Sequence, residues 1–292
     1  MTQSFLPGPW VNPEIREERP WSHSGGIVKF FEFPVRIDAM SRRAFHLYWQ
    51  RHHSPNVMNV TGFAQFMRKY NSGHIFPDPC PELPTHYSQD HVFEGAAEVW
   101  VNSWQEVGDW LGHPLYAEIV QPDEPRFIAQ DGRSAILVTK EEHLYEPDPD
   151  MAENGKVKAY LLMGRRPGLD RDVFHQRLSE YGHAMLADHG LHARLLKLVI
   201  SHRLPDPNPI EGLPETDVDG VVELWFASRA DMAAFFADTA YIQGVAPLEA
   251  NFADLHTLRA LAARMRVVHD EFSFQPSTMQ PLPFDWADGE VG

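Results

Sequence analysis

Apolar runs of strand length alternate along the chain with segments whose apolar residues recur at helical spacing. The run GIVKFFEFPV (26–35) is rich in β-branched and aromatic residues, which predicts a strand. In the segment that follows, Ser41 is a suitable N-cap and Pro55 is expected to end or bend a helix. Four residues of this segment share one helical face: Phe45, Tyr48, Trp49 and His52. We therefore predict an amphipathic helix over 41–57.

The same alternation predicts the order β-α-β-β-α-β in each half of the chain. In the first half we expect strands at 26–35, 63–75, 94–103 and 134–146, and helices at 41–57 and 103–116. In the second half we expect strands at 156–165, 193–204, 219–228 and 261–272, and helices at 170–190 and 229–242. The last strand has an alternative, because the helical spacing that precedes it can extend through 263–267.

The two halves also repeat the same short motifs in the same order, offset by about 125 to 130 residues. Each half has a Phe-His pair in its first helix and, later, a tyrosine 16 positions after a tryptophan. The matching motifs are HIFPDP (74–79) with HRLPDP (202–207), and EGAAEVWV (94–101) with DGVVELWF (219–226). The two proline-rich loops that follow the first of these motifs also correspond: 77–93 and 205–218. These repeats indicate an internal duplication.

A half of this kind has an antiparallel sheet with helices on one face, so its other face needs cover. We predict an α+β fold in which two ferredoxin-like halves close into an α/β barrel, with helices outside and a ligand cavity inside. The expected parts are an N-terminal arm (1–26), a first half (27–146), a linker (147–155), a second half (156–272) and a C-terminal tail (273–292).

The composition is that of an acidic globular protein. Hydrophobic residues make up 43% of the chain, and the formal net charge is −16, which disfavours nucleic acid and anionic membrane surfaces as partners. Cys80 is the single cysteine, so no intramolecular disulfide can form. No apolar run approaches the roughly 20 residues of a membrane span, and the first residues lack an apolar signal core. We expect a cytoplasmic protein.

Strand alternation predicts which side chains face the barrel interior. Glu98 and Trp100 share one face of their strand, and Glu223 and Trp225 repeat the arrangement. Because a lone buried charge is costly, each glutamate is expected to find a lysine. The candidate pairs are Glu98 with Lys29, and Glu223 with Lys158. These glutamates are either structural ion pairs or polar anchors for a ligand, and the two tryptophans are either core residues or stacking platforms.

The chain has 16 histidines, several of which lie near the predicted helix ends. His52 and His53 are neighbours at the end of the first helix, so only one of them can readily point inward, and Asn56 follows closely. His74 ends the second strand, and His183 lies on the matching helix of the second half. A histidine of this kind either has a surface or capping role or serves as a general base near neutral pH.

A metal site is the competing interpretation of the histidines. The sequence contains no HExxH motif and no His-x-His with a carboxylate at a familiar spacing. Distant residues could still assemble a site in the folded chain. We assign no metal and no cofactor.

The segment that opens the first half resembles the start of an EthD-type domain of the dimeric α/β-barrel superfamily. In that pattern a strand and a turn lead into a helix with Phe, then Trp four residues on, then His four further. Phe45, Trp49 and His53 match these positions here. The second half resembles the same opening, but Leu178 replaces the Trp and His183 falls one residue late.

The resemblance covers about 27–145 and 156–272, and this chain resembles a tandem version of domains that usually dimerise. It implies a hydrophobic cavity with a few polar groups. The family's relatives include cofactor-free polyketide cyclases, dehydratases, lactone isomerases and small monooxygenases, and more distant relatives bind haem.

From these observations we expect a cofactor-independent lyase, dehydratase, isomerase or cyclase that acts on a small aromatic or polyketide-like carbonyl compound. His53, or His52 if the helix is rotated, is the expected base, with Tyr116 or Tyr70 as a donor to the developing oxyanion. The substrate-binding residues expected are Trp49, Asn56, His74, Glu98, Trp100, His183 and Trp225. The alternatives are an oxidative enzyme, either haem-bound or cofactor-free, and a non-catalytic protein that binds a hydrophobic metabolite. A homodimer remains possible.

Overall fold

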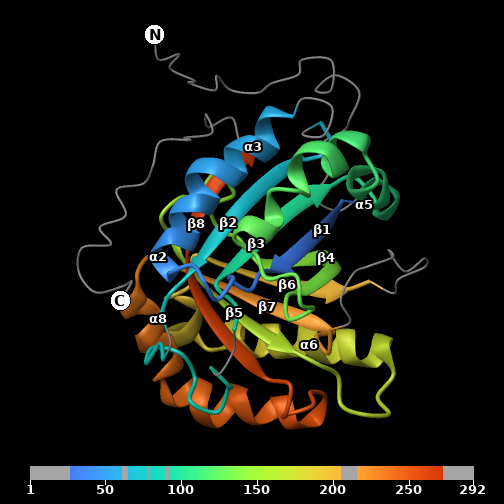
Figure 1. Ribbon diagram of the computed structural model, residues 1–292. Helices are drawn as coiled ribbons and strands as arrows, with labels where there is room; N and C mark the ends of the chain where they lie inside the picture. The colour runs from blue at the N-terminus through green and yellow to red at the C-terminus, as the bar shows by residue number, and fades with distance from the viewer. Residues whose placement is uncertain (1–26, 61–64, 78, 90–91, 205–215, 272–292) are drawn as a thin grey trace.

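Eight antiparallel strands close into a barrel in the computed structural model of the chain (Figure 1). The structure describes residues 27–60, 65–77, 79–89, 92–204 and 216–271. The predicted N-terminal arm, most of the 205–218 loop and the C-terminal tail lie outside the described residues. Within the described part, no helix is both long and apolar enough to cross a membrane.

The order of elements matches the predicted β-α-β-β-α-β plan in both halves. The first half contains β1 (Val28–Phe33), α2 (Arg42–Tyr48), η1 (Trp49–His53), α3 (Ser54–Asn59), β2 (Lys69–Ile75), β3 (Gly95–Val101), α5 (Trp104–Leu111), η2 (Tyr116–Val120), η3 (Glu124–Arg126) and β4 (Ala135–Tyr145). The second half contains β5 (Val157–Met163), α6 (Arg171–Ala187), α7 (His189–His192), β6 (Lys197–Arg203), β7 (Gly220–Phe226), α8 (Arg229–Phe236), η4 (Ala240–Val245), η5 (Ala246–Asn251) and β8 (Arg259–Asp270).

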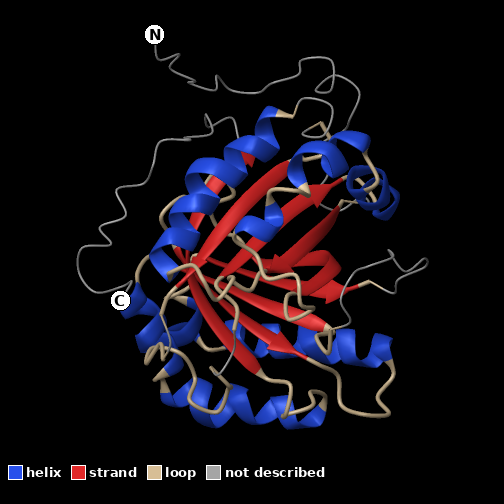
Figure 2. Cartoon of the chain, in the orientation of Figure 1, coloured by secondary structure: helices blue, strands red, loops and turns tan. Residues whose placement is uncertain are grey.

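The barrel closes because the two half-sheets join edge to edge. Each half has the same strand order, β4-β1-β3-β2 in the first and β8-β5-β7-β6 in the second. Antiparallel pairing of β2 with β8 and of β4 with β6 connects them. Closure removes the free strand edges of both half-sheets. The helices lie outside the strands on two opposite sides, as Figure 2 shows. The predicted α+β fold with two fused ferredoxin-like halves is confirmed.

The structure excludes two local alternatives that the sequence left open. Pro55 does not end the helical segment, which continues from the π-helical turn η1 into α3 with Pro55 in the first turn of α3. The helical alternative for the last element is also wrong. Residues from Arg259 onward form β8, because β8 pairs with β5 on one side and with β2 on the other.

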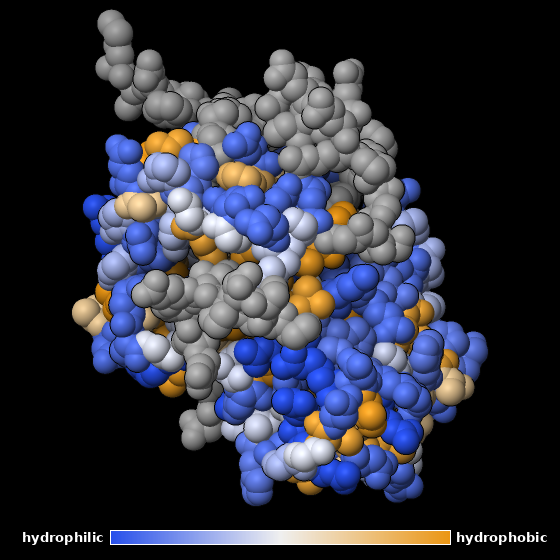
Figure 3. Space-filling view, turned by 90° about the vertical axis from the view of Figure 1, so that its right-hand side faces the viewer, coloured by the Kyte–Doolittle hydropathy of each residue, from blue (hydrophilic) through white to orange (hydrophobic). Residues whose placement is uncertain are grey.

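One surface of the molecule, shown in Figure 3, is mostly hydrophilic and carries hydrophobic residues in small separate groups. The large hydrophobic side chains that are exposed come from several unrelated elements: Val92, Ile119, Val173, Ile242, Leu248 and Leu255. Scattered residues of this kind are ordinary for a globular protein.

In the part of the chain that the structure describes, buried side chains fill the barrel interior, where we expected the ligand cavity. One part is an apolar cluster that includes Phe31, Phe33, Tyr160, Leu162 and Trp225. All five side chains are buried. They project inward from a closed sheet of eight strands, a size of barrel that either is filled by side chains or holds one small ligand. The prediction of a cavity inside the barrel was therefore wrong.

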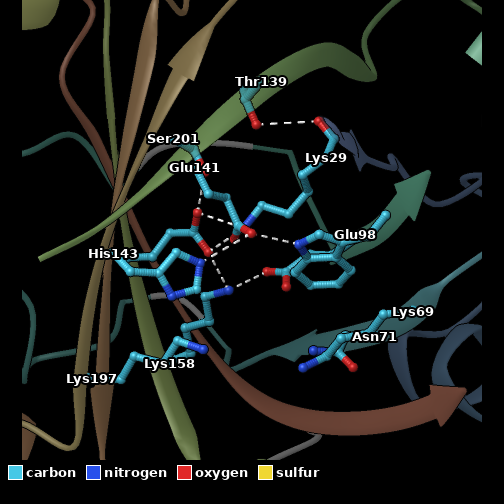
Figure 4. Close-up of polar contacts among 12 residues, drawn as sticks. Lys29, Lys69, Asn71, Glu98, Thr139, Glu141, His143, Lys158, Lys197 and Ser201 are labelled. Atoms are coloured by element: carbon cyan, nitrogen blue, oxygen red, sulfur yellow. Dashed lines mark hydrogen bonds and ion pairs between the residues drawn. The ribbon is translucent and has the colours of Figure 1, made fainter. Parts of the chain in front are cut away.

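The other part of the barrel interior is a network of buried charges (Figure 4). The Nζ atom of Lys29 lies 2.6 Å from carboxylate oxygens of both Glu141 and Glu223. The Nζ atom of Lys158 lies 2.5 Å from oxygens of both Glu98 and Glu223. The expected pair of Glu223 with Lys158 is confirmed, whereas Lys29 forms its ion pairs with Glu141 and with Glu223 of the other half instead of Glu98.

The charges of this network stabilise one another. Burial by itself lowers the pKa of Lys29, but the carboxylates of Glu141 and Glu223 outweigh it and raise that pKa above its ordinary value. Burial likewise favours the neutral form of Glu223, but Lys158 and Lys29 lower the pKa of Glu223 below its usual range. The network thus holds both halves together through ionised groups whose removal would leave partners unpaired.

Candidate active site

A cavity of about 630 Å³ lies in the first half, between the outer face of the half-sheet and the helices that cover it. The strand residues that line it come from the outward-facing positions of the sheet, among them Phe30, Glu32 and Tyr70. Helical residues such as Trp49 and His53 form the facing wall. The cavity is thus mostly apolar with a few polar groups, which is typical of small-molecule sites.

His53 is held at this cavity by a carboxylate. Its Nδ1 atom lies 2.9 Å from Oδ2 of Asp123, and its ring packs 4.7 Å from that of Phe127. The hydroxyl of Tyr48 donates to the other oxygen of Asp123 at 2.5 Å. The hydrogen bond from His53, and then that from Tyr48, hold the pKa of Asp123 below its ordinary value against the effect of burial. An ionised Asp123 therefore orients the imidazole and accepts its Nδ1 proton.

The π-helical turn η1 decides which histidine reaches the cavity. His53 is 8% exposed and lines the cavity, whereas His52 is exposed and its ring lies against Tyr48. A π-helical turn adds one residue to the helix and re-aims the side chains beyond it. In the second half the corresponding helix, α6, is a regular helix of 17 residues.

Two glutamates that sequence reasoning missed also line the cavity. Glu32 lies on β1, and burial, with a contribution from the charge of Glu124, raises its pKa from 4.5 to about 8. Glu124 accepts a hydrogen bond of 2.9 Å from the hydroxyl of Tyr116, and burial raises the pKa of Glu124 as well. The sequence did contain a signal for Glu32, because it is a single carboxylate on the helix-facing side of an apolar strand.

Tyr70 belongs to a hydrogen-bonded group on the same wall. Its hydroxyl accepts from Nε1 of Trp49 at 2.9 Å and lies 3.3 Å from Oγ of Ser54. Burial raises the pKa of Tyr70, so this phenol stays protonated near neutral pH. Tyr70 is thus a hydrogen-bonding group at the cavity wall, whereas Tyr116 already donates to Glu124.

The raised pKa of Glu32 predicts a pH dependence of stability. Between about pH 4.5 and pH 8 the unfolded chain has Glu32 ionised, while the folded chain keeps its proton, so stability falls as the pH rises through this window. In the Glu32→Gln variant this contribution disappears. We expect its melting temperature to exceed that of the wild type increasingly towards pH 8, and to match it below about pH 4.5. A difference in melting temperature that stays constant with pH would contradict the assignment.

Three predicted site residues do not line the cavity and are exposed or partly exposed at the surface of the molecule. His52 and His183 are exposed. Asn56 is partly exposed, and its amide lies 3.5 Å from the carbonyl oxygen of Ile119. These positions follow from the rotation of the helices, which directs neighbouring residues to different faces.

His74 is buried behind the cavity wall instead of lining it. Its Nδ1 atom lies 3.0 Å from Nδ1 of His46, and its ring contacts that of Trp49. Burial, with a smaller effect of Arg266, lowers the pKa of His74 to about 3, so the imidazole is neutral. The repeated Phe-His and His-x-x-Pro motifs thus provide a pair of packed histidines, and the second half repeats it with His175 and His202.

The other predicted binding residues, Glu98, Trp100 and Trp225, lie inside the barrel. Nε1 of Trp100 donates to Glu141 at 2.6 Å, and the ammonium of Lys158 lies 4.6 Å from the ring centre of Trp225. Glu98 accepts from the hydroxyl of Tyr160 at 2.7 Å. These side chains belong to the packed interior and are separated from the cavity by the sheet.

The equivalent space in the second half is filled with side chains. Leu161 stands where the first half has Glu32, and Leu198 where it has Tyr70, and both are fully buried. Phe76 and three residues of the proline-rich loop that follows it in the first half complete this core: Cys80, Leu83 and Tyr87. Among the described residues, the space between half-sheet and helices is therefore a cavity with polar side chains in the first half and a packed core in the second.

The EthD domain profile matches two segments of the chain, residues 37–131 and 166–256, which together exceed half of its length. The chain belongs to the EthD domain family. It carries two EthD domains in tandem, and the earlier resemblance is confirmed. No protein with a curated function matches the sequence.

Solved structures of similar fold have low sequence identity to this tandem EthD protein. An anthrone oxidase-like protein aligns with a TM-score of 0.51 at 10% identity, over 87% of this chain and 99% of the other. A mutant chlorite dismutase from Candidatus Nitrospira defluvii aligns with a TM-score of 0.45 at 11% identity, over 84% and 93%. A dimeric protein of unknown function with a ferredoxin-like fold from Bacteroides fragilis gives a TM-score of 0.30 at 13% identity, over 38% and 97%. At such identities the similarity concerns the fold.

The residues at the cavity do not fit a haem group. His53 could supply an axial nitrogen, but the two propionates of haem are anionic and are normally paired with cations. The described residues that line the cavity include Glu32 and Glu124 and no lysine or arginine. Nor does any group of three or more His, Cys, Asp or Glu side chains within the described ranges have an arrangement that could hold a metal ion.

Proposed function

We propose that the cavity of the first EthD domain catalyses proton transfer on a small aromatic carbonyl compound, with His53 as general base and Glu32 as general acid. The observation that carries this proposal is that both groups line one apolar cavity, with His53 held by Asp123 and with the pKa of Glu32 raised to about 8. Enzymes commonly keep a carboxylic acid protonated near neutral pH, ready to act as a general acid, by placing it in an apolar environment.

The proton transfers balance without an oxidant. Asp123 accepts a hydrogen bond from Nδ1–H of His53 and stays ionised, which leaves the unprotonated Nε2 free to remove a proton from the carbon next to the carbonyl group. Glu32, protonated near neutral pH, donates to the carbonyl oxygen as negative charge develops there. Tyr70 is a second donor available at the same wall. The resulting enol can be reprotonated elsewhere or can lose a β-hydroxyl as water, so the proposal covers isomerases, dehydratases, cyclases and lyases.

An exchange reaction tests the proposal without knowledge of the natural substrate. The probe is 6-hydroxy-2-tetralone, a bicyclic phenol whose ketone has acidic benzylic α-hydrogens, and NMR measures deuterium uptake at these positions in D2O. We expect the protein to accelerate this exchange. In the Asp123→Asn variant we expect kcat to fall by at least about 10-fold with little change in KM, because Asp123 orients the base and does not line the cavity. Exchange no faster than in buffer would refute the proposal.

An oxidative reaction is the second candidate. A carbanion formed by His53 could also react with dioxygen, and one solved structure of this fold is named an anthrone oxidase-like protein. Oxygen uptake measured during the same incubation distinguishes the two, because proton transfer alone consumes no oxygen.

A further inference from the structure

In the second half, a tyrosine side chain of the protein contacts the glutamate that corresponds to Glu124 of the cavity. Glu249 corresponds to Glu124, because each follows the tryptophan of its half by 24 positions, Trp100 and Trp225. The hydroxyl of Tyr87, in the proline-rich loop of the first half, donates to Oε1 of Glu249 at 2.9 Å. The phenol group of Tyr87 is therefore hydrogen-bonded to the carboxylate of Glu249 in the second half.

Tyr87 is bound in the manner of a ligand in a closed site. Its side chain is 3% exposed and belongs to the apolar core between the half-sheet and helices of the second half. Two further donors reach Glu249: the hydroxyl of Tyr181 lies 2.5 Å from Oε1, and Nε2 of His86 lies 2.9 Å from Oε2. Both oxygens of this buried carboxylate thus have donors, which is what a buried charge requires.

The first half has the same carboxylate at an open cavity. Glu124 lines the cavity and accepts from Tyr116 at 2.9 Å. Tyr116 corresponds to Tyr241, since each follows its tryptophan by 16 positions. The cavity of the first half is therefore arranged around a glutamate that, in the duplicate, receives a phenol.

We propose that Glu124 determines substrate specificity by accepting the hydroxyl group of a phenolic substrate, as Glu249 accepts that of Tyr87. This inference rests on the proposed function for the identity of the site, but it concerns binding and not the proton transfer. The hydroxyl group of a ligand can donate a further hydrogen bond to the Glu124 carboxylate beside that of Tyr116, whereas an ether oxygen in the same place cannot donate. The carboxylate of Glu124 also disfavours a substrate that brings a second carboxylate close to it.

A matched pair of ligands tests this specificity by calorimetric titration. We expect 6-hydroxy-2-tetralone to bind the wild type at least about 10-fold more tightly than 6-methoxy-2-tetralone, since a hydrogen bond to a charged group contributes about 1.5 to 3 kcal/mol. The Glu124→Gln variant should lose most of this preference, and the control Glu118→Gln, at an exposed position of η2, should keep it. Equal affinity of the two ligands for the wild type would overturn the proposal.

A second measurement uses the internal phenol. The Tyr87→Gly variant removes the ring from the core, and p-cresol should raise its melting temperature by several degrees more than it raises that of the wild type. Toluene and 4-methylanisole should raise it much less, because neither donates to Glu249. Rescue by toluene equal to that by p-cresol would show that the site recognises the ring alone and would overturn the inference. If Tyr87→Gly does not fold, Tyr87→Phe, which keeps the ring, should still melt below the wild type.

The two proposals fail in different ways. A hydroxyl preference in binding without any deuterium exchange would refute the proton-transfer function and leave the role of Glu124 intact. Exchange that proceeds equally well with the hydroxy and methoxy probes would do the reverse.

Discussion

Replacement of His53 by alanine is expected to lower the rate of deuterium exchange by about 10²- to 10⁴-fold, the range that a well-placed general base contributes. The imidazole lines the cavity and is oriented by Asp123, whose carboxylate accepts the Nδ1 proton at 2.9 Å. No other described histidine lines this cavity, so the chain offers no neighbouring base of the same kind. Exchange would be followed by NMR with the hydroxytetralone probe at neutral pH.

The neighbouring residue provides the control for this variant. His52 is exposed on the same helix, so His52→Ala changes the same residue type without reaching the cavity, and its rate should stay within about 2-fold of the wild type. Added imidazole should restore part of the activity of His53→Ala, because the variant leaves a space of imidazole size beside Asp123. An exchange rate that survives in His53→Ala would assign the base to another group.

Replacement of Lys29 by methionine is expected to destabilise the protein by about 3 to 5 kcal/mol, the usual cost of breaking a buried ion pair from one side. Lys29 is fully buried in the barrel interior, and its ammonium lies 2.6 Å from both Glu141 and Glu223. Methionine retains the length of the side chain but leaves these carboxylates with less positive charge. The free energy of unfolding, measured with urea, should fall accordingly.

A surface ion pair gives the matched comparison. Arg177 lies 2.7 Å from Glu180 on α6, and both side chains are about half exposed. Arg177→Met should therefore change the free energy of unfolding by only about 0 to 1 kcal/mol. If the two variants lost similar stability, the barrel network would not hold the halves together in the way described.

The duplication has produced two EthD domains with different uses for the same space. In the second domain, Leu161 and Leu198 replace Glu32 and Tyr70, and Tyr87 of the first domain completes the core. Apolar burial of this kind contributes about 25 cal/mol per Å² to stability. The second domain thus contributes stability to the barrel, and the first domain keeps the polar cavity.

The role of several residues could be predicted from their positions in strands. Alternation along β3 and β7 placed Glu98, Trp100, Glu223 and Trp225 on the inner face, where they are found. It did not predict that Lys29 would bind Glu223, which lies in the other half. Strand alternation fixes the face of a side chain, but partners across a closed barrel depend on how the strands are staggered around it.

The cavity shows the same division. The Phe, Trp and His spacing of the first helix predicted a role for His53, but it did not predict the carboxylates Asp123, Glu32 and Glu124. Asp123 and Glu124 lie where η2 leads into the single turn of η3, a stretch too short for periodicity to indicate which way a side chain points. The π-helical turn that separates His53 from His52 likewise depends on local hydrogen bonding that residue spacing does not reveal.

The sequence by itself therefore determined the duplicated β-α-β-β-α-β plan, the closure of two halves into one unit and the inner faces of the strands, because these follow from local periodicity and repetition. Only the tertiary structure decided that the barrel interior is filled, that the cavity lies under the helices of the first half and that Tyr87 occupies the equivalent space in the second. Those outcomes depend on side-chain volumes meeting across segments far apart in the chain, and local pattern contains no measure of them.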